Sequence, residues 1–318
     1  MLTFGTAQAE RTLSEIPQWW YACLYTGGSN ATDDVIAGLL PPMLADVRMS
    51  GAQRWFFIRY FDDSGPHLRL RIFGPARALN RLVRSYSDVS AHLDLMRQIE
   101  RGEPVELMKG PKHPGQLRDS VGISPAVYAP EIEKYGGMDG VELAEAFFEF
   151  SSELALWAVA QHQKGSSRDA LAILLLSDSV DSLLTGPTAS HWWQRQRVSV
   201  DRFWQIHANW WTGAIHGDDA FRQLTRNHAS AHRESMQDRI AIVAAEPNVL
   251  AWRQRWFKAI DAYLNDVHDY DVGRTAQHLV FHQNHMIMNR LGYLPREEAL
   301  LGMYAADWME TPAFTHDR

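Results

Sequence analysis

The sequence predicts an α+β fold: an N-terminal mixed, largely antiparallel sheet packed with helices, followed by a mostly helical C-terminal half. Two observations carry this prediction. Alternation of apolar and polar residues with period two, typical of half-buried strands, is concentrated before Gly74. From Asp139 onward, apolar residues recur at helical spacing instead. We expect a single unit over residues 1–318, with a strand-rich part at 1–130 and a helix-rich part at 131–318.

The strand-rich part is expected to alternate strands with helices. Strands are predicted at 19–25, 53–61 and 67–73, and helices at 33–49, interrupted by Pro41-Pro42, and at 76–95. The turn residues 62–66 make the second and third strands an antiparallel hairpin. Residues 102–125 are rich in Pro, Gly and Lys and predict a long surface loop. A short strand at 124–128 is expected to join the sheet.

The helix-rich part begins with a capping box. Asp139 and Glu142 have the spacing of that motif, and a long helix follows from 141 to 163. Further helices are predicted at 168–184, 195–215, 218–245, 249–267 and 272–291. Gly292 stands at the usual C-terminal stop of the last of these.

Composition excludes several classes of protein. A net charge of −7 argues against general nucleic-acid binding. No apolar stretch is long enough to span a membrane, and the N-terminus lacks the pattern of a signal peptide. The single cysteine, Cys23, excludes an internal disulfide and suits a reducing cytosol. We therefore expect a cytoplasmic protein in which Cys23 is an inert buried thiol.

The segment Pro66–Gly74 is the most informative run of the chain. Period two places His67, Arg69 and Arg71 on one face and the apolar residues between them on the other. Two guanidiniums side by side on an open face form a ready cradle for an anion. The alternative is a solvated face on which both arginines pair with Asp or Glu of the same chain.

Three further clusters carry residues capable of chemistry. Tyr128–Gly137 holds two carboxylates, Lys134 and two tyrosines, although an ordinary loop and helix cap would look the same. His278, His282, His285 and Asn289 share one helical stripe. Buried, hydrogen-bonded histidines are the common alternative there, and we predict no metal site, because no Cys or suitably spaced Glu accompanies them. Ser151-Ser152 lacks the nucleophile elbow of serine hydrolases.

Together these segments resemble a known family. The resemblance is to the C-terminal elimination domain of class I lantibiotic dehydratases, which also occurs alone as thiopeptide-type biosynthesis proteins. The residues that carry it are Arg59-Tyr60-Phe61-Asp62 with Pro66–Gly74, Tyr128–Gly137 with Ser151-Ser152, and His285–Gly292. Their order and spacing agree across most of the chain.

The resemblance implies tailoring of a ribosomally made peptide. Such domains remove glutamate from glutamylated Ser or Thr of a leader-bound precursor peptide, giving dehydroalanine or dehydrobutyrine. By the motif match, Arg69 and Arg71 would hold the glutamyl group and His285 would be the acid/base group. Lys134 stands where the family usually has an arginine, and it keeps the charge without the planar fork.

The residues expected to assist in substrate binding are Arg59, His67, Tyr135, Ser152 and Asn289. No cofactor is implied, since the reaction is neither redox nor in need of a metal. The expected partners are the precursor peptide with its leader and a separate glutamylation protein, with no direct contact to nucleic acid or membrane. The prediction also allows a homodimer.

Two alternatives stay open at this point. Related pyridine synthases use the same fold for a formal aza-[4+2] cycloaddition of two dehydroalanines, with macrocyclisation and loss of the leader. Ser152, Tyr135 and His285 would then serve that reaction. The other alternative is a non-catalytic scaffold that binds the precursor peptide, in which Arg69 and Arg71 would be tied up in ion pairs within the chain.

Overall fold

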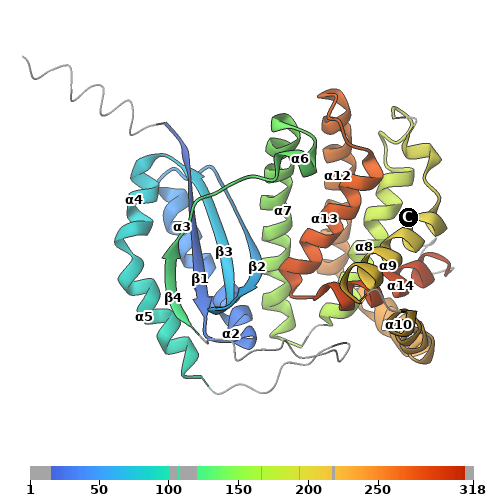
Figure 1. Ribbon diagram of the computed structural model, residues 1–318, viewed down its shortest axis with the longest axis horizontal. Coiled ribbons are helices and arrows are strands. Elements are labelled where there is room, and N and C mark those ends of the chain that lie inside the picture. The colour runs from blue at the N-terminus through green and yellow to red at the C-terminus, as the bar shows by residue number, and fades with distance from the viewer. Residues whose placement is uncertain are drawn as a thin grey trace, which may run out of the picture. The chain divides into compact units, whose positions relative to one another are not determined.

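The computed structural model describes residues 16–99, 107, 120–165, 167–192, 194–216 and 219–311. The chain divides into two compact units, each drawn in Figure 1. Unit 1 comprises Met1–Glu106, Pro111–Pro130 and Phe148–Val159, and unit 2 comprises Leu107–Gly110, Glu131–Phe147 and Ala160–Arg318. The predicted α+β class, with strands early and helices late, is confirmed.

Unit 1 contains a four-stranded antiparallel sheet in the order β2-β3-β1-β4. The strands are β1 Gln18–Thr26, β2 Arg54–Asp62, β3 Gly65–Gly74 and β4 Val121–Pro125. The predicted hairpin is β2-β3. The fourth strand ends at Pro125 rather than beginning near it, and one further backbone hydrogen bond, from the Ala126 N–H to the Tyr21 carbonyl at 3.0 Å, follows it. The loop predicted at 102–125 lies largely outside the described residues, and its last five residues form β4.

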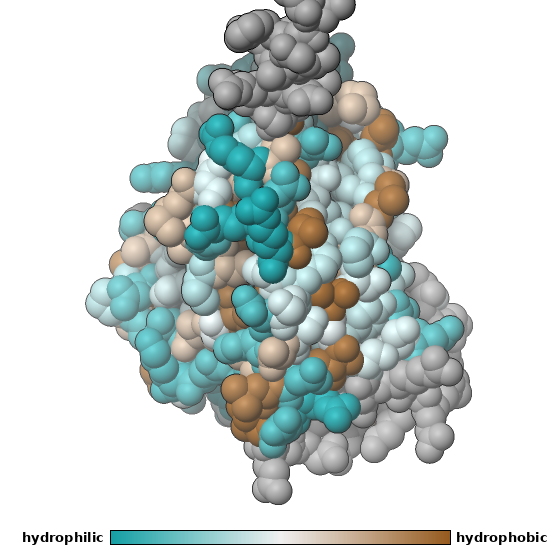
Figure 2. All heavy atoms as spheres, turned by 90° about the vertical axis from the view of Figure 1, so that its left-hand side faces the viewer, coloured by the Kyte–Doolittle hydropathy of each residue, from teal (hydrophilic) through white to brown (hydrophobic). Residues whose placement is uncertain are grey.

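One face of this sheet is apolar and covered by helices. Leu24, Leu68, Leu70 and Ile72 are fully buried on it. The helices of this layer are α2 Ser29–Asp34, α3 Leu40–Met49, α4 Ala76–Arg84 and α5 Tyr86–Arg97 (Figure 1). The face turned to the viewer in Figure 2 is largely hydrophilic, with smaller apolar areas between. Val83 of α4 and Leu95 of α5 are exposed apolar side chains.

The chain stays helical through Pro41-Pro42, where the sequence predicts an interruption. A π-helical turn, Val35–Leu39, joins α2 to α3, and the prolines fall in the first turn of α3. The wider π-helical turn lies directly before the prolines, whose missing N–H groups cannot bond to the preceding turn. The irregularity therefore comes just before the prolines instead of at them.

Unit 2 is built around a helix that is buried on all sides. This helix, α8 Arg168–Thr185, is buried at every position from 170 to 183, with two aspartates, Asp178 and Asp181, among apolar and small residues. Helices α11, α12, α13 and α14 pack against it. The other helices are α6 Ile132–Tyr135, α7 Met138–His162, α9 Val200–His216, α10 Asp219–Ala231, α11 Arg233–Ala244, α12 Pro247–Asp269, α13 Ala276–Leu291 and α14 Pro295–Met309. Residues 148–159 of α7 belong to unit 1.

Several predicted boundaries in unit 2 shift. The helix predicted at 218–245 is two helices, separated at His232, whose backbone leaves helical geometry. Helix α14 is not predicted from the sequence, although Pro295 and two glutamates in its first turn are start signals. Gly292 ends α13 in the left-handed conformation, as predicted.

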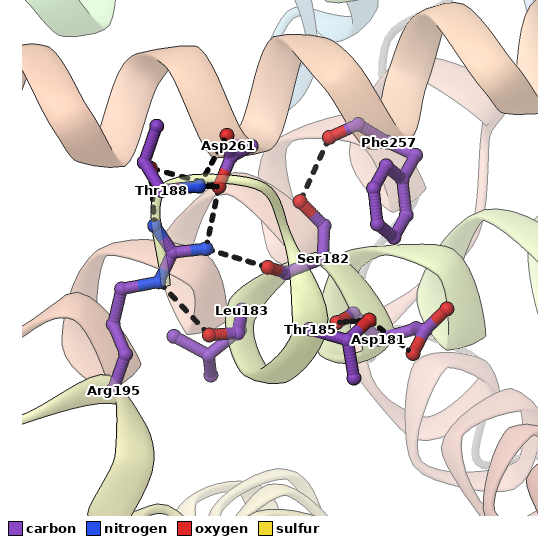
Figure 3. A network of polar contacts seen from close by, with 8 residues as sticks. All are labelled: Asp181, Ser182, Leu183, Thr185, Thr188, Arg195, Phe257 and Asp261. Atoms are coloured by element: carbon purple, nitrogen blue, oxygen red, sulfur yellow. Dashed lines mark hydrogen bonds and ion pairs between the residues drawn. The ribbon is translucent and has the colours of Figure 1, made fainter. Parts of the chain in front are cut away.

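The helix predicted from residue 195 begins at Val200, because Arg195 lies in a short 3-10 turn. The side chain of Arg195 is part of a buried network. The guanidinium of Arg195 donates to two carbonyls in the last turn of α8, that of Ser182 at 2.6 Å and that of Leu183 at 2.9 Å (Figure 3). It also donates to Thr188 Oγ1 at 2.9 Å and to Asp261 Oδ1 at 2.7 Å. The network caps α8 and ties it to α12.

In the described part of the chain, no helix combines the length and the apolar character that a bilayer crossing requires.

Candidate functional site

Strand β3 presents the three polar residues of the Pro66–Gly74 run on one face. The register places Arg71 between Phe56 of β2 and Tyr21 of β1. Residues 67 and 69 occupy the next two rows of the same face. This is the face opposite the helix-covered one, as the period-two pattern predicts.

Arg71 is buried among aromatic rings. Its guanidinium carbon lies 4.6 Å from the ring centre of Tyr21, 5.0 Å from that of Tyr128 and 5.2 Å from that of Phe56. Burial lowers the pKa of Arg71, and the phenols of Tyr21 and Tyr128 oppose this shift. Because an arginine stays charged in proteins, the rings hold a desolvated cation.

Arg69 stacks on a ring as well, its guanidinium carbon 3.2 Å from the ring centre of Tyr60. Within the described residues, neither Arg69 nor Arg71 forms an ion pair with a carboxylate. The Nε atoms of both are buried without a hydrogen-bond partner there. Asp62 lies within electrostatic range of Arg69 but forms no ion pair with it. Two neighbouring cations without an ion pair in the described residues are the arrangement expected of an anion cradle.

His67 is held as a neutral ring. Its Nδ1 donates to the carbonyl of Gly65 at 3.1 Å, and its ring packs against Tyr25 and Tyr60. Burial lowers the pKa of His67, opposed by the Gly65 contact and by Asp62. A neutral imidazole beside Arg69 adds no further positive charge to the cradle.

Two residues expected to bind substrate, Arg59 and Ser152, have contacts within the chain. In the strand register Arg59 lies opposite Leu68, so its side chain is on the helix-covered face of the sheet. There it forms an ion pair with Asp33 of α2 at 2.6 Å. Ser152 is fully buried, and its Oγ accepts a hydrogen bond from the Phe57 N–H at 3.3 Å. Neither side chain joins the face that carries Arg69 and Arg71.

Unit 2 carries the histidine stripe on α13. His278, His282, His285 and Asn289 are all half-buried, as residues sharing one helical face. His278 Nε2 donates to the Lys134 carbonyl at 3.0 Å, and the rings of His278 and His282 lie 4.4 Å apart. Burial, with the positive charge of Lys134 next, lowers the pKa of His282 to about 3. His282 is therefore neutral at physiological pH.

His285 is paired with a buried carboxylate. Its Nδ1 lies 2.8 Å from Oε2 of Glu298 on α14, and its ring stacks on Trp211 of α9 at 4.5 Å between centres. The other oxygen of Glu298, Oε1, lies 3.4 Å from Nε2 of His207. Burial raises the pKa of Glu298, but the contacts from His207 and His285 outweigh it and keep the pKa below its usual value. A carboxylate oxygen can only accept, so this contact is one that an Nδ1–H of His285 donates.

The remaining candidates lie on or near α6. The Nζ of Lys134 is 3.1 Å from Oε2 of Glu131, and its ammonium lies 5.5 Å from the ring centre of Tyr135. Tyr135 is buried, with its ring centre 6.4 Å from that of His282. No group of His, Cys, Asp or Glu in the described residues has the arrangement of a metal site.

Several residues of these two regions are not predicted from the sequence. Tyr21 and Tyr60 follow from the strand register, which brings them beside Arg71 and over Arg69. Glu298 and His207 lie on helices with no motif that marks them, and α14 itself is unpredicted. The one sequence feature connected with this contact is Gly302, a glycine inside α14. A Cβ at this position would lie 2.4 Å from Nδ1 of His207.

Comparison with known proteins settles the family. The profile described as "Lantibiotic biosynthesis dehydratase C-term" matches residues 19–308. The chain belongs to this family. Among curated proteins, no sequence matches the chain. The predicted resemblance to the lantibiotic dehydratase C-terminal domain is thereby confirmed.

Solved structures share the fold of this lantibiotic dehydratase C-terminal domain. The pyridine synthase TbtD from thiomuracin biosynthesis has a TM-score of 0.67 at 20% identity, covering 94% of this chain and 99% of that one. TsrL has a TM-score of 0.61 at 16% identity, covering 95% and 98%. The tRNA-dependent lantibiotic dehydratase MibB from Microbispora sp. 107891 has a TM-score of 0.57 at 22% identity. That match covers 91% of this chain, which corresponds to 27% of MibB.

Proposed function

We propose that this chain is a tailoring lyase that eliminates glutamate from glutamylated Ser or Thr of a leader-bound precursor peptide. The products are dehydroalanine or dehydrobutyrine and free glutamate. One observation carries the proposal above the others: Arg69 and Arg71 are neighbours on one face of the sheet, and neither forms an ion pair with a carboxylate of the described residues. Family membership supplies the chemical context.

The leaving group explains the arginines. In the elimination, a base removes the α-proton, the electron pair forms the Cα–Cβ double bond, and the Cβ–O bond breaks to release a carboxylate. Free glutamate carries a second carboxylate that also has to be held. Guanidiniums bind carboxylates through paired N–H donors, and the buried position of Arg71 strengthens such a contact by excluding water.

The α-proton requires an acceptor, for which we propose His285. Its Nδ1 is occupied by Glu298, so Nε2 is the atom that takes the proton. We also propose Lys134 as a supporting cation, with Tyr135 and Asn289 as binding residues.

The test uses a synthetic peptide that carries a glutamyl ester on one serine. The wild-type chain is expected to release glutamate and leave dehydroalanine, read by mass spectrometry. Arg71→Ala and Arg69→Ala are expected to leave the ester intact, whereas Arg84→Ala, which removes an exposed arginine of the same unit, is expected to react normally. Full turnover by Arg71→Ala would contradict the assignment.

A second candidate is pyridine synthesis by formal aza-[4+2] cycloaddition. The specific observation in its favour is that Lys134, in place of the arginine usual in the family, is paired with Glu131 at 3.1 Å. The end-to-end match to a pyridine synthase fits the same reading. A linear peptide with two dehydroalanines is the discriminating substrate: a macrocycle with released leader supports cycloaddition, and an unchanged mass removes it.

The proposed elimination also requires a partner reaction. A separate glutamylation protein would supply the ester, and the leader would deliver the precursor peptide. The scaffold alternative predicts Arg69 and Arg71 in ion pairs, and none is found in the described part of the chain. This favours an enzyme over a scaffold.

A further inference from the structure

We infer that Glu298 is a positioning residue that holds His285 in the Nδ1–H form, with His207 as its second partner. The inference rests on the proposed function for its catalytic consequence, but its geometric content can be tested by itself. Glu298 comes from α14, His285 from α13 and His207 from α9, all within unit 2.

The burial of Glu298 is the first argument. Its side chain is about 1% exposed, and a carboxylate removed from water is costly unless its oxygens are compensated. Each oxygen faces a different imidazole, Oε2 at 2.8 Å from His285 and Oε1 at 3.4 Å from His207. The carboxylate is therefore part of a cluster of three groups, in which Oε2 accepts a hydrogen bond from His285 and Oε1 lies beside Nε2 of His207 without hydrogen-bond geometry.

The difference between the two histidines is the second argument. His207 is fully buried, while the side chain of His285 is 26% exposed. Only His285 has a ring edge available to a ligand. A carboxylate accepts and does not donate, so Nδ1 of His285 carries a proton, and Nε2 is the ring nitrogen left for a ligand.

Packing around the cluster is the third argument. Trp211 stacks on the His285 ring and also contacts His207, which restricts the rotation of both rings. Gly302 lies against Nδ1 and Cε1 of His207, where a Cβ would come within 2.4 and 2.6 Å. The glycine allows α14 to approach α9 closely enough for Glu298 to reach His207. A ring fixed on one side by a carboxylate and on its face by an indole is oriented as a base requires.

The first experiment reads the tautomer directly. Long-range proton–nitrogen spectra of the full chain with labelled histidine are recorded for wild type, Glu298→Gln and the control Glu297→Gln. Glu297 is the adjacent buried carboxylate, which accepts from the N–H groups of Leu294 and Leu107 and does not face these histidines. The Nδ1–H form is expected for His285 in wild type and in Glu297→Gln, with a mixed population in Glu298→Gln. An Nε2–H form in wild type, or an unchanged tautomer in Glu298→Gln, overturns the inference.

The second experiment measures elimination from the glutamyl-ester peptide. Because general-base catalysis contributes on the order of a hundredfold or more, Glu298→Gln is expected to lower kcat by about that factor with little change in KM. Glu297→Gln is expected to keep wild-type kcat. A shifted tautomer with unaltered kcat would refute His285 as the base and leave the positioning intact. Lost activity with an unaltered tautomer would refute the positioning. If Glu298→Gln fails to fold, the wild-type spectrum still decides the tautomer.

Discussion

Arg195 of unit 2 and Arg71 of unit 1 are both buried, yet their surroundings are opposite. The guanidinium of Arg195 donates to two backbone carbonyls, to the Thr188 hydroxyl and to the Asp261 carboxylate (Figure 3). The guanidinium of Arg71 is enclosed by Tyr21, Phe56 and Tyr128, and donates one hydrogen bond, at 3.4 Å, to the carbonyl of Arg69.

We interpret this difference as that between an arginine that holds the fold and one that we propose binds a ligand. A buried cation is tolerated when its own chain supplies acceptors, as at Arg195. Aromatic rings stabilise a cation without using its N–H donors, because they act through the ring quadrupole. Arg71 therefore keeps directional donors for an incoming carboxylate, and this is why we place glutamate binding in unit 1.

The largest expected effect is on stability at Arg195. Arg195→Met leaves Asp261 buried without its cation, and such a loss typically costs about 3–5 kcal/mol of unfolding free energy. Arg71→Met removes no partner of a carboxylate and should cost about 1 kcal/mol or less. Urea denaturation of both variants measures this difference. Equal losses would mean that Arg71 is a structural residue too.

The next effect is on ligand binding, and the order of the two variants reverses. Arg71→Met is expected to weaken binding of free glutamate by about 10- to 100-fold, since charge-assisted hydrogen bonds are worth about 1.5–3 kcal/mol. Arg195→Met, measured at a temperature where it is folded, should bind glutamate as wild type does. Calorimetric titration measures both. If Arg195→Met weakened binding as much as Arg71→Met, the contrast would fail.

The same contrast shows what the sequence can and cannot predict. The strand 67–73 is recognisable because period two is a local property, and so are the polar face with Arg69 and Arg71 and the stop at Gly292. The partner of each arginine is not local: Asp261 is 66 positions from Arg195, and Tyr128 reaches Arg71 from beyond β4. Glu298 and His207 escaped prediction for the same reason, since only the packing of α9, α13 and α14 brings them to His285.

A smaller effect is expected at Gly186, which borders the Arg195 network. A Cβ there would lie 2.2 Å from Asp261 Oδ1 and 2.8 Å from Arg195 Nη2. Gly186→Ala should force the pair apart and cost about 1–3 kcal/mol of unfolding free energy, as overpacking usually does. Gly273→Ala is the matched control, because its Cβ would meet no atom within 4 Å. Similar denaturation midpoints for the two variants would show that the network relaxes without loss.

The smallest effect tests the ring beneath Arg69. Tyr60 is 45% exposed, so replacing it with leucine should change stability little while removing the face on which the guanidinium stacks. A cation–π contact at a partly exposed site is worth about 0.5–1 kcal/mol, which corresponds to a two- to fivefold weaker affinity for glutamate. Tyr270→Leu, at an exposed tyrosine of unit 2, is the control for a lost phenol. Unaltered glutamate affinity in Tyr60→Leu would mean that Arg69 needs no ring to present its donors, and the aromatic enclosure would then matter for Arg71 alone.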